Sequence, residues 1–175
     1  MSNWHGETAV GGTVEWYTPP EFFERLGMTF DTDPASPGAD VVSWVPATRH
    51  WTPRENGLLQ PWDGRVWLNP PYGPQAVPFL HRLATHGDGV ALVFSRTETA
   101  WWRSVAPRAD IVCFLRDRLH HVRADGHKGR GAMGSALLVF GRRNVGPVVA
   151  ADLGWCVTTL DAGVTVVSQP EGAQA

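Results

Sequence analysis

Two short segments hold residue types that could perform chemistry together. Asn69-Pro70-Pro71-Tyr72 follows the short strand predicted over residues 65–68, and Asp33-Pro34-Ala35 lies at the end of the strand predicted over residues 28–33. The two prolines fix the backbone and remove two N–H groups, so the oxygens of Asn69 and Pro70 would form a rigid acceptor surface beside the Tyr72 ring. Such a surface fits a planar amine that donates two hydrogen bonds and stacks on an aromatic ring, as the exocyclic amine of a nucleobase does.

This amine is a poor nucleophile because its lone pair is delocalised into the base. Acceptors that draw its hydrogens out of the ring plane would localise the lone pair, and methyl transfer from a sulfonium donor would then need little beyond in-line placement. Other site chemistry has weaker support. Ser95 and Ser135 have no partnered His/Asp pattern, and His120-His121 lack the spacing of metal ligands, so we predict neither a nucleophilic triad nor a metal site.

The elements that must position these segments alternate between strand and helix, which is typical of an α/β domain with a mostly parallel sheet. Ligands of such sheets lie beyond the carboxyl ends of the strands, so the turns after strands 28–33 and 65–68 would face one crevice if these strands are neighbours. Segments 39–64 and 116–134 show no clear element. We expect the strand over 135–140 to pair antiparallel. Further strands are predicted over 89–95, 109–115 and 164–167, and helices over 18–27 (with Thr18 as N-cap), 75–86 and 97–105.

Length and composition exclude several classes of protein. The chain has 175 residues, 43% hydrophobic and 18% charged, as in one globular domain rather than a disordered tail. The longest apolar runs have five residues, whereas a membrane span needs about 20. Cys113 and Cys156 are too few for a disulfide scaffold, and no secretory signal follows Met1, so we expect a cytoplasmic protein.

Charge is unevenly distributed, although the formal net charge is only −2. Residues 1–60 contain eight acidic side chains and three arginines, whereas residues 96–130 contain eight basic side chains and four acidic ones. All but one of the 15 basic residues are arginine, which suits bidentate and stacked contacts with phosphates and bases. The basic segment therefore either faces a polyanion or forms a solvated surface loop.

Taken in order, the motifs resemble those of the phage DNA N-6-adenine-methyltransferase (Dam) family. Asn69-Pro70-Pro71-Tyr72 alone is similar to the motif of several classes of amino-methyltransferase, and the ordered set is more specific. It covers residues 16–141, which we take as the methyltransferase domain, between an N-terminal extension of residues 1–15 and a C-terminal extension of residues 142–175 with a frayed end. The matching segments are 16–19, 30–35, 56–62, 67–73, 96–102, 114–119 and 134–135.

The resemblance implies a Rossmann-like fold that binds S-adenosylmethionine. Thr18-Pro19 would contact the methionine end of this cofactor, and Asp33-Pro34-Ala35 would form the cofactor loop, with Asp33 accepting from the methionine ammonium. Asn56 is a candidate for the ribose, beside Glu55. One departure from the usual pattern is the turn after the first strand, where Ser36-Pro37-Gly38 supplies a single glycine.

The resemblance also implies that the methyl group goes to the N6 amine of a flipped-out adenine in DNA. Asn69 and Pro70 would hold this amine, and Tyr72 would stack on the base. Flipping a base out of a duplex costs about a few kcal/mol, and we expect the basic segment to compensate by clamping phosphates. The expected DNA contacts are Arg96, Arg116, Arg118, Arg123, Lys128 and Arg130.

Size and motif chemistry leave three questions open. A separate target-recognition domain does not fit beside the core, so we expect a short or relaxed recognition sequence unless a homodimer partner contributes. The same fold could instead act on cytosine N4 or on an RNA base, although the leading Asn69 in place of Ser disfavours cytosine. The single-glycine turn favours a third alternative, a nucleic-acid-binding module without catalysis.

Overall fold

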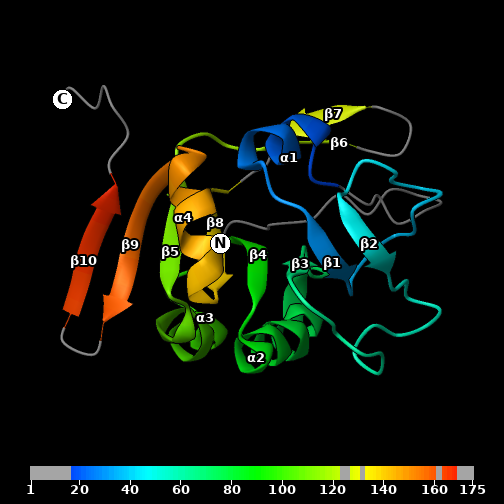
Figure 1. The fold of residues 1–175 in the computed structure, drawn as a ribbon, viewed down its shortest axis with the longest axis horizontal. Coiled ribbons are helices and arrows are strands. Elements are labelled where there is room, and N and C mark those ends of the chain that lie inside the picture. The colour runs from blue at the N-terminus through cyan, green and yellow to red at the C-terminus, as the bar shows by residue number, and fades with distance from the viewer. Residues whose placement is uncertain (1–16, 123–126, 131–132, 161–162, 169–175) are drawn as a thin grey trace, which may run out of the picture.

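The computed structural model describes residues 17–122, 127–130, 133–160 and 163–168, which form a mixed α/β fold around one eight-stranded sheet (Figure 1). The strand order is β10-β9-β5-β8-β4-β3-β1-β2, so β10 and β2 lie at the two edges. Five strands run in one direction, as the alternation of strand and helix predicts. They are β1 (Phe30–Asp33), β2 (Ala47–His50), β3 (Val66–Leu68), β4 (Gly89–Phe94) and β5 (Ile111–Leu115).

An antiparallel strand lies in the middle of this sheet. β8 (Ser135–Phe140) inserts between β4 and β5 and pairs antiparallel with both, which confirms the direction expected from the sequence. All six of its residues are buried, which fits the apolar character of the five that follow Ser135. Beyond β5 the sheet continues antiparallel through β9 (Gly154–Leu160) and β10 (Gly163–Ser168).

Helices cover both faces of the sheet, and each face has its own core. α1 (Pro20–Leu26) and α4 (Arg142–Ala150) pack on one face, where Phe22, Phe23 and Phe30 surround Trp67. α2 (Ala76–His86) and α3 (Ala100–Val105) lie next to each other on the other face (Figure 1). Short 3-10 turns, η1 (Gly73–Gln75) and η2 (Ala106–Arg108), precede α2 and follow α3.

The start of α1 differs from the sequence prediction. Pro19, and not Thr18, is the N-cap residue, and no side chain caps the helix. Proline suits the first helical positions because its missing N–H has no partner there, so a helix that begins at Pro20 does not need the Thr18 hydroxyl. The other end follows the prediction, since Gly27 adopts a left-handed conformation with φ 63°.

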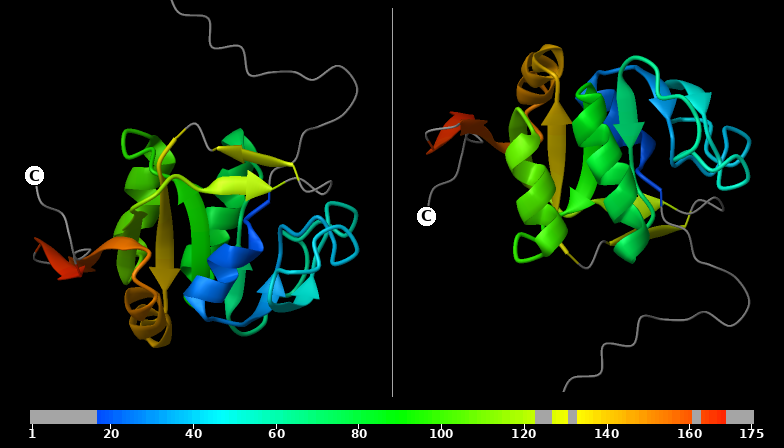
Figure 2. Two further views of the ribbon diagram at one scale, coloured as in Figure 1. Left: turned by 90° about the horizontal axis from the view of Figure 1, so that it is seen from above. Right: turned by 90° about the horizontal axis from the view of Figure 1, so that it is seen from below.

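A two-stranded hairpin lies apart from the main sheet (yellow in Figure 2, left). It consists of β6 (His120–Val122) and β7 (Lys128–Arg130), in a segment where the sequence predicted only a loop. Tyr17 and Val122 exchange backbone hydrogen bonds of 2.8 and 3.0 Å, which fasten the hairpin to the segment before α1. Among the helices that the structure describes, none has the length and apolar character needed to cross a bilayer.

Candidate functional site

The carboxyl ends of β1 and β3 lie side by side because the two strands are parallel neighbours. Asp33 ends β1 and Asn69 follows β3, and both residues line one cavity of about 530 Å³, here named the Asp33 cleft. Most residues predicted to bind a cofactor also line it, namely Thr18, Asp33, Pro34, Ala35 and Asn56. Pro19 instead lines a smaller cavity, together with Arg118 and Lys128.

The Asp33 carboxyl is buried at the floor of the cleft, with 3% of the residue exposed. Its Oδ1 accepts a hydrogen bond of 3.2 Å from the Ala35 N–H, and its Oδ2 lies 3.9 Å from His50 Nδ1. Burial raises the pKa of Asp33 to about 7, against the lowering effect of the Ala35 hydrogen bond. A cation placed in the cleft would favour the ionised carboxylate, so Asp33 is suited to hold an ammonium group.

Side-chain hydrogen bonds support the turn after β1, which contains one glycine. Ser36 Oγ accepts from the Gly38 N–H at 3.1 Å and lies 3.0 Å from His50 Nδ1 on β2. Gly38 has φ 113°, a conformation that L side chains rarely adopt. The turn is therefore fixed by Ser36 and by its neighbouring strand rather than by further glycines.

Thr18 presents a buried hydroxyl with an unused hydrogen-bonding capacity. The residue is 2% exposed and lines the Asp33 cleft, while its carbonyl accepts from Trp44 Nε1 at 2.8 Å. Its Oγ1 has no hydrogen-bond partner among the described residues. An unsatisfied buried polar atom destabilises the folded state by about 1–3 kcal/mol, so a polar ligand in the cleft would find a partner here.

A second cavity, of about 810 Å³, meets the cleft at the turn after β3 and is here named the His121 cavity. Asn69, Pro70, Pro71 and Tyr72 line both cavities, so this turn lies where the two spaces come together. Within the described part of the chain, the Asn69 side chain has no hydrogen-bond partner of its own. Its amide is therefore available to a ligand in either cavity.

Tyr72 is stacked and yet open to the solvent. Its ring lies 5.2 Å from the Phe94 ring, centroid to centroid, with only 14° between the planes, and 51% of the residue is exposed. Partial burial of the phenol raises the pKa of Tyr72, which keeps the hydroxyl protonated at neutral pH. Phe94 thus supports one face of a flat ring that has surface left for another planar group.

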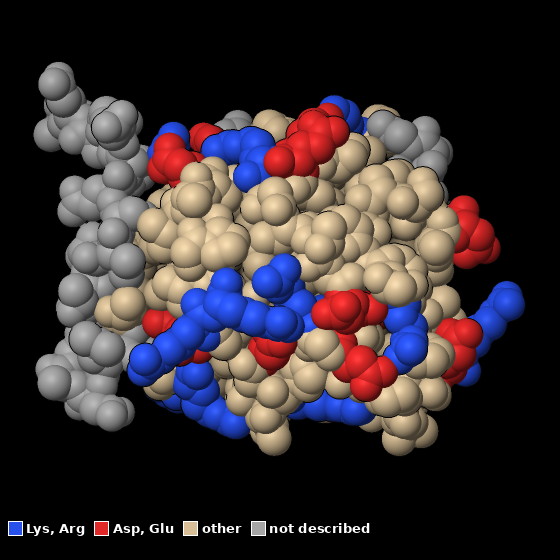
Figure 3. All heavy atoms as spheres, in the orientation of Figure 1, with Lys and Arg blue, Asp and Glu red and all other residues tan. Residues whose placement is uncertain are grey.

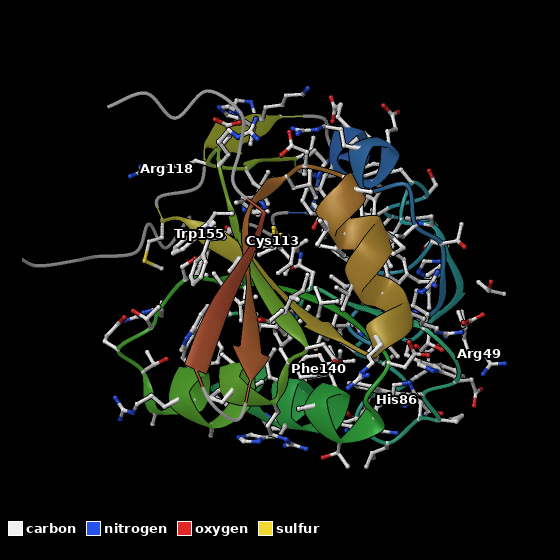
Figure 4. The ribbon with its side chains drawn as sticks, turned by 60° about the vertical axis from the view of Figure 1, so that its left-hand side comes forward. Arg49, His86, Cys113, Arg118, Phe140 and Trp155 are labelled. Atoms are coloured by element: carbon white, nitrogen blue, oxygen red, sulfur yellow. The ribbon has the colours of Figure 1, made fainter. Side chains whose placement is uncertain are left out.

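The predicted DNA contacts do not form one cluster. Arg96 lines the His121 cavity and pairs with Glu98 at 3.2 Å, whereas Arg116 pairs with Asp152 at 2.9 Å and Lys128 with Glu21 at 3.0 Å. Arg118 points outward from the sheet in Figure 4. On the face of the molecule drawn in Figure 3, basic and acidic side chains lie next to each other. Arg123 and the side chain of Arg130 lie outside the described residues.

Two further residues of the site could not be assigned from the sequence. His121 and Phe94 line the same cavity as Tyr72. The sequence contains the pair His120-His121, but it does not tell which ring faces inward. In a β-strand successive side chains point to opposite faces, and the strand β6 that separates the two rings in this way was not predicted. In the part of the chain that the structure describes, no group of three or more His, Cys, Asp or Glu side chains could hold a metal ion.

The fold and site define an α/β protein with a cleft at the carboxyl ends of adjacent parallel strands. The family model of DNA N-6-adenine-methyltransferase (Dam) matches residues 7–154, which is most of the chain. The chain therefore belongs to this family, as its motifs indicated, and membership implies a DNA adenine methyltransferase. No curated protein and no solved structure matches the chain.

Proposed function

We propose that this protein transfers the methyl group of S-adenosylmethionine to the N6 amine of an adenine that is flipped out of DNA. The observation that carries the proposal is the position of Asn69, Pro70 and Tyr72 at the junction of two cavities. One cavity would hold the methyl donor and the other the base, so that the reacting atoms would meet beside the Asn69 amide. Membership of the family supports the choice of acceptor.

The Asp33 cleft has the size and the polar groups that this cofactor needs. Ligand pockets commonly measure about 300–1,000 Å³, and the cleft lies within this range at about 530 Å³. Asp33 would hold the methionine ammonium, the unpaired Thr18 hydroxyl would bind its carboxylate, and Asn56 would lie toward the ribose. When bound, S-adenosylmethionine supplies a methyl group on a positively charged sulfur.

Asn69, Pro70 and Tyr72 would orient the acceptor. The Asn69 side-chain oxygen and the Pro70 carbonyl would accept the two amine hydrogens, which localises the nitrogen lone pair toward the methyl carbon. In this transfer the C–N bond would form as the S–C bond of the donor breaks, and the proton that the nitrogen loses would pass to the solvent by way of these two oxygens. Tyr72, supported by Phe94, would stack on the base and keep its amine in line.

The basic residues would bind the DNA backbone around the flipped base. Arg96 borders the cavity proposed for the base, and we assign it to the phosphates beside the target nucleotide. Arg116, Arg118, Arg123, Lys128 and Arg130 would contact more distant phosphates along the duplex. Several of these side chains are exposed and held by acidic neighbours, so binding DNA would exchange those ion pairs for phosphate contacts.

The test is nucleoside mass spectrometry of DNA from cells that express the wild-type protein or the Asn69→Ala variant. We expect N6-methyladenine with the wild type and its loss with the variant, while a matched exposed substitution, Arg142→Ala on α4, should leave it unchanged. Detection of N4-methylcytosine, or of methylated RNA alone, would show that the acceptor is a cytosine or an RNA base and not adenine in DNA. Isothermal titration with S-adenosylmethionine covers the remaining alternative, since absence of binding would favour a module without catalysis.

A further inference from the structure

His121 presents a buried imidazole to the cavity that the proposed function assigns to the base. The residue is 6% exposed and lines the His121 cavity together with Asn69 and Tyr72, whereas its neighbour His120 is exposed on the other face of β6. Its position is well fixed, because His121 pairs with Gly129 across the hairpin and the next residue exchanges two backbone hydrogen bonds with Tyr17.

Both ring nitrogens of His121 are buried, and neither has a partner at hydrogen-bond geometry among the described residues, although the ring lies close enough to the Tyr17 backbone for that backbone to act on its pKa. Buried polar atoms are rarely left without partners, and two on one side chain call for an explanation. Several other polar side chains of the cavity wall are already engaged: Thr99 caps α3 and donates to Arg96 O at 2.7 Å, and His81 Nε2 lies 3.3 Å from Ser104 Oγ. The imidazole is therefore a polar group that a ligand in this cavity can complete.

The chemistry of the ring indicates what it would bind. Burial lowers the pKa of His121, with the Tyr17 backbone offsetting part of the effect, so the imidazole is neutral at pH 7. A neutral imidazole offers one N–H donor and one acceptor nitrogen. In adenine, the carbon that bears the N6 amine is bonded to N1 on one side and to C5, the neighbour of N7, on the other. The amine is therefore flanked by two hydrogen-bond acceptors, N1 and N7.

With the amine at Asn69 and Pro70, an N–H on the wall of the same cavity would have an acceptor nitrogen to bind on either edge of the base. Guanine would present an N1–H donor on one side and no amine at the same position. The His121 donor thus matches adenine and mismatches the other purine on its Watson–Crick edge.

We propose that His121 contacts the flipped adenine through its ring N–H, which donates to N1 or N7, and that a contact with N1 makes it a specificity-determining residue against guanine. This inference rests on the proposed function, because it takes the His121 cavity as the pocket for the base. It adds a contact from the β6–β7 hairpin to those made by the turn after β3. The hairpin would thereby join base recognition to the basic side chains that it carries.

The test pairs a change in the protein with a change of one atom in the base. Duplexes with one target adenine, or with 1-deazaadenine or 7-deazaadenine in its place, are methylated by the wild type and by His121→Phe. For the wild type, we expect kcat/KM to fall about tenfold to a hundredfold on one of the two analogues. For His121→Phe, we expect kcat/KM on adenine to be lower than that of the wild type by a similar factor. The variant should then methylate that analogue as well as it methylates adenine.

The ratio of kcat/KM on adenine to kcat/KM on each analogue is compared between the wild type and His121→Phe. If this ratio is the same in both proteins for both analogues, the role of His121 is overturned. Absence of methyl transfer by the wild type to adenine would instead overturn the proposed function, so the two failures are distinct. His121→Asn, which keeps a donor, covers the case in which the phenylalanine variant does not fold, and it should retain part of the discrimination. His120→Phe is the matched control, and it should leave kcat/KM on all three duplexes unchanged.

Discussion

Gly57 lies directly against the carbonyl of Pro34, so that a Cβ atom at Gly57 would stand 1.8 Å from the Pro34 oxygen. This contact joins the segment between β2 and β3 to the turn after β1, and both line the Asp33 cleft. The Gly57 carbonyl accepts from Trp62 Nε1 at 2.8 Å, and Arg82 donates to Gln60 O at 2.6 Å. The segment therefore has little freedom to move away from a larger side chain.

We expect Gly57→Ala to displace one wall of the cleft and to weaken S-adenosylmethionine binding at least tenfold. Real Cβ atoms do not approach backbone oxygen this closely, so either the Pro34 turn or the Asn56–Gly57 segment must shift. Isothermal titration measures the effect. Gly146→Ala on α4 is the control, because nothing lies within 4 Å of its Cβ and alanine favours a helix. Unchanged affinity in Gly57→Ala would show that this wall does not contact the cofactor.

Asp33→Asn should separate stability from cofactor binding. Since burial raises the pKa of Asp33 from 3.8 to about 7, the folded protein holds a proton between these values that the unfolded chain has lost. The free energy of unfolding contributed by Asp33 is therefore largest at low pH and falls as the pH rises through this window. Asparagine removes the dependence, so the variant should gain stability relative to the wild type between pH 5 and pH 8.

Urea unfolding at pH 5, 6.5 and 8 measures this difference, with the exposed Asp117→Asn as the control. Cofactor affinity should fall in Asp33→Asn even where its stability rises, because an amide cannot neutralise an ammonium group. A parallel pH dependence of wild type and variant would mean that Asp33 ionises as an ordinary exposed carboxyl does.

Tyr72→Ala and Tyr72→Phe should differ strongly in activity. If the ring acts by stacking, phenylalanine preserves it, and kcat/KM on DNA should stay within a few-fold of the wild type. Removing a base-stacking aromatic costs about 1–3 kcal/mol, so alanine should lower kcat/KM roughly tenfold to a hundredfold. Phe94→Ala should give a smaller loss, since it removes the support of the Tyr72 ring and not the ring itself. Equal losses in Tyr72→Ala and Tyr72→Phe would point to the hydroxyl instead.

The central strands could be predicted because consecutive apolar residues indicate a buried strand without any knowledge of the rest of the fold. β4 and β8 each contain an apolar run of five residues, 90–94 and 136–140, that is almost wholly buried in the finished sheet. β2 could not be predicted in this way, because Ala47–His50 is polar and lies at the edge of the sheet, where its side chains remain partly exposed. α4 contains Gly146 and Pro147, which disfavour a helix locally, and it is stabilised by burying Val148 against the sheet.

The candidate site shows the same division between local and long-range information. Asn69 to Tyr72 form one contiguous motif, and the sequence predicted that Asp33 would face it only on the condition that the strands before the two turns are neighbours, which the parallel pairing of β1 with β3 fulfils. His121 reaches the cavity only because a three-residue strand pairs across a hairpin and with Tyr17. The contact of Gly57 with Pro34 depends in the same way on packing between segments that are distant in the sequence.

Arg118 and Arg116 should contribute unequally to DNA binding, although they are two positions apart. Arg116 is held by Asp152 at 2.9 Å, whereas Arg118 makes no ion pair with any residue the structure describes and points outward (Figure 4). A phosphate contact made by Arg118 therefore breaks no existing pair. We expect Arg118→Ala to reduce the slope of log affinity against log salt by about one unit, and Arg116→Ala to reduce it less. Fluorescence anisotropy over a range of salt concentrations measures both slopes, and Arg142→Ala on α4 controls for the loss of a positive charge. A larger effect of Arg116→Ala would mean that the Asp152 pair opens on DNA and that Arg118 faces away from the duplex.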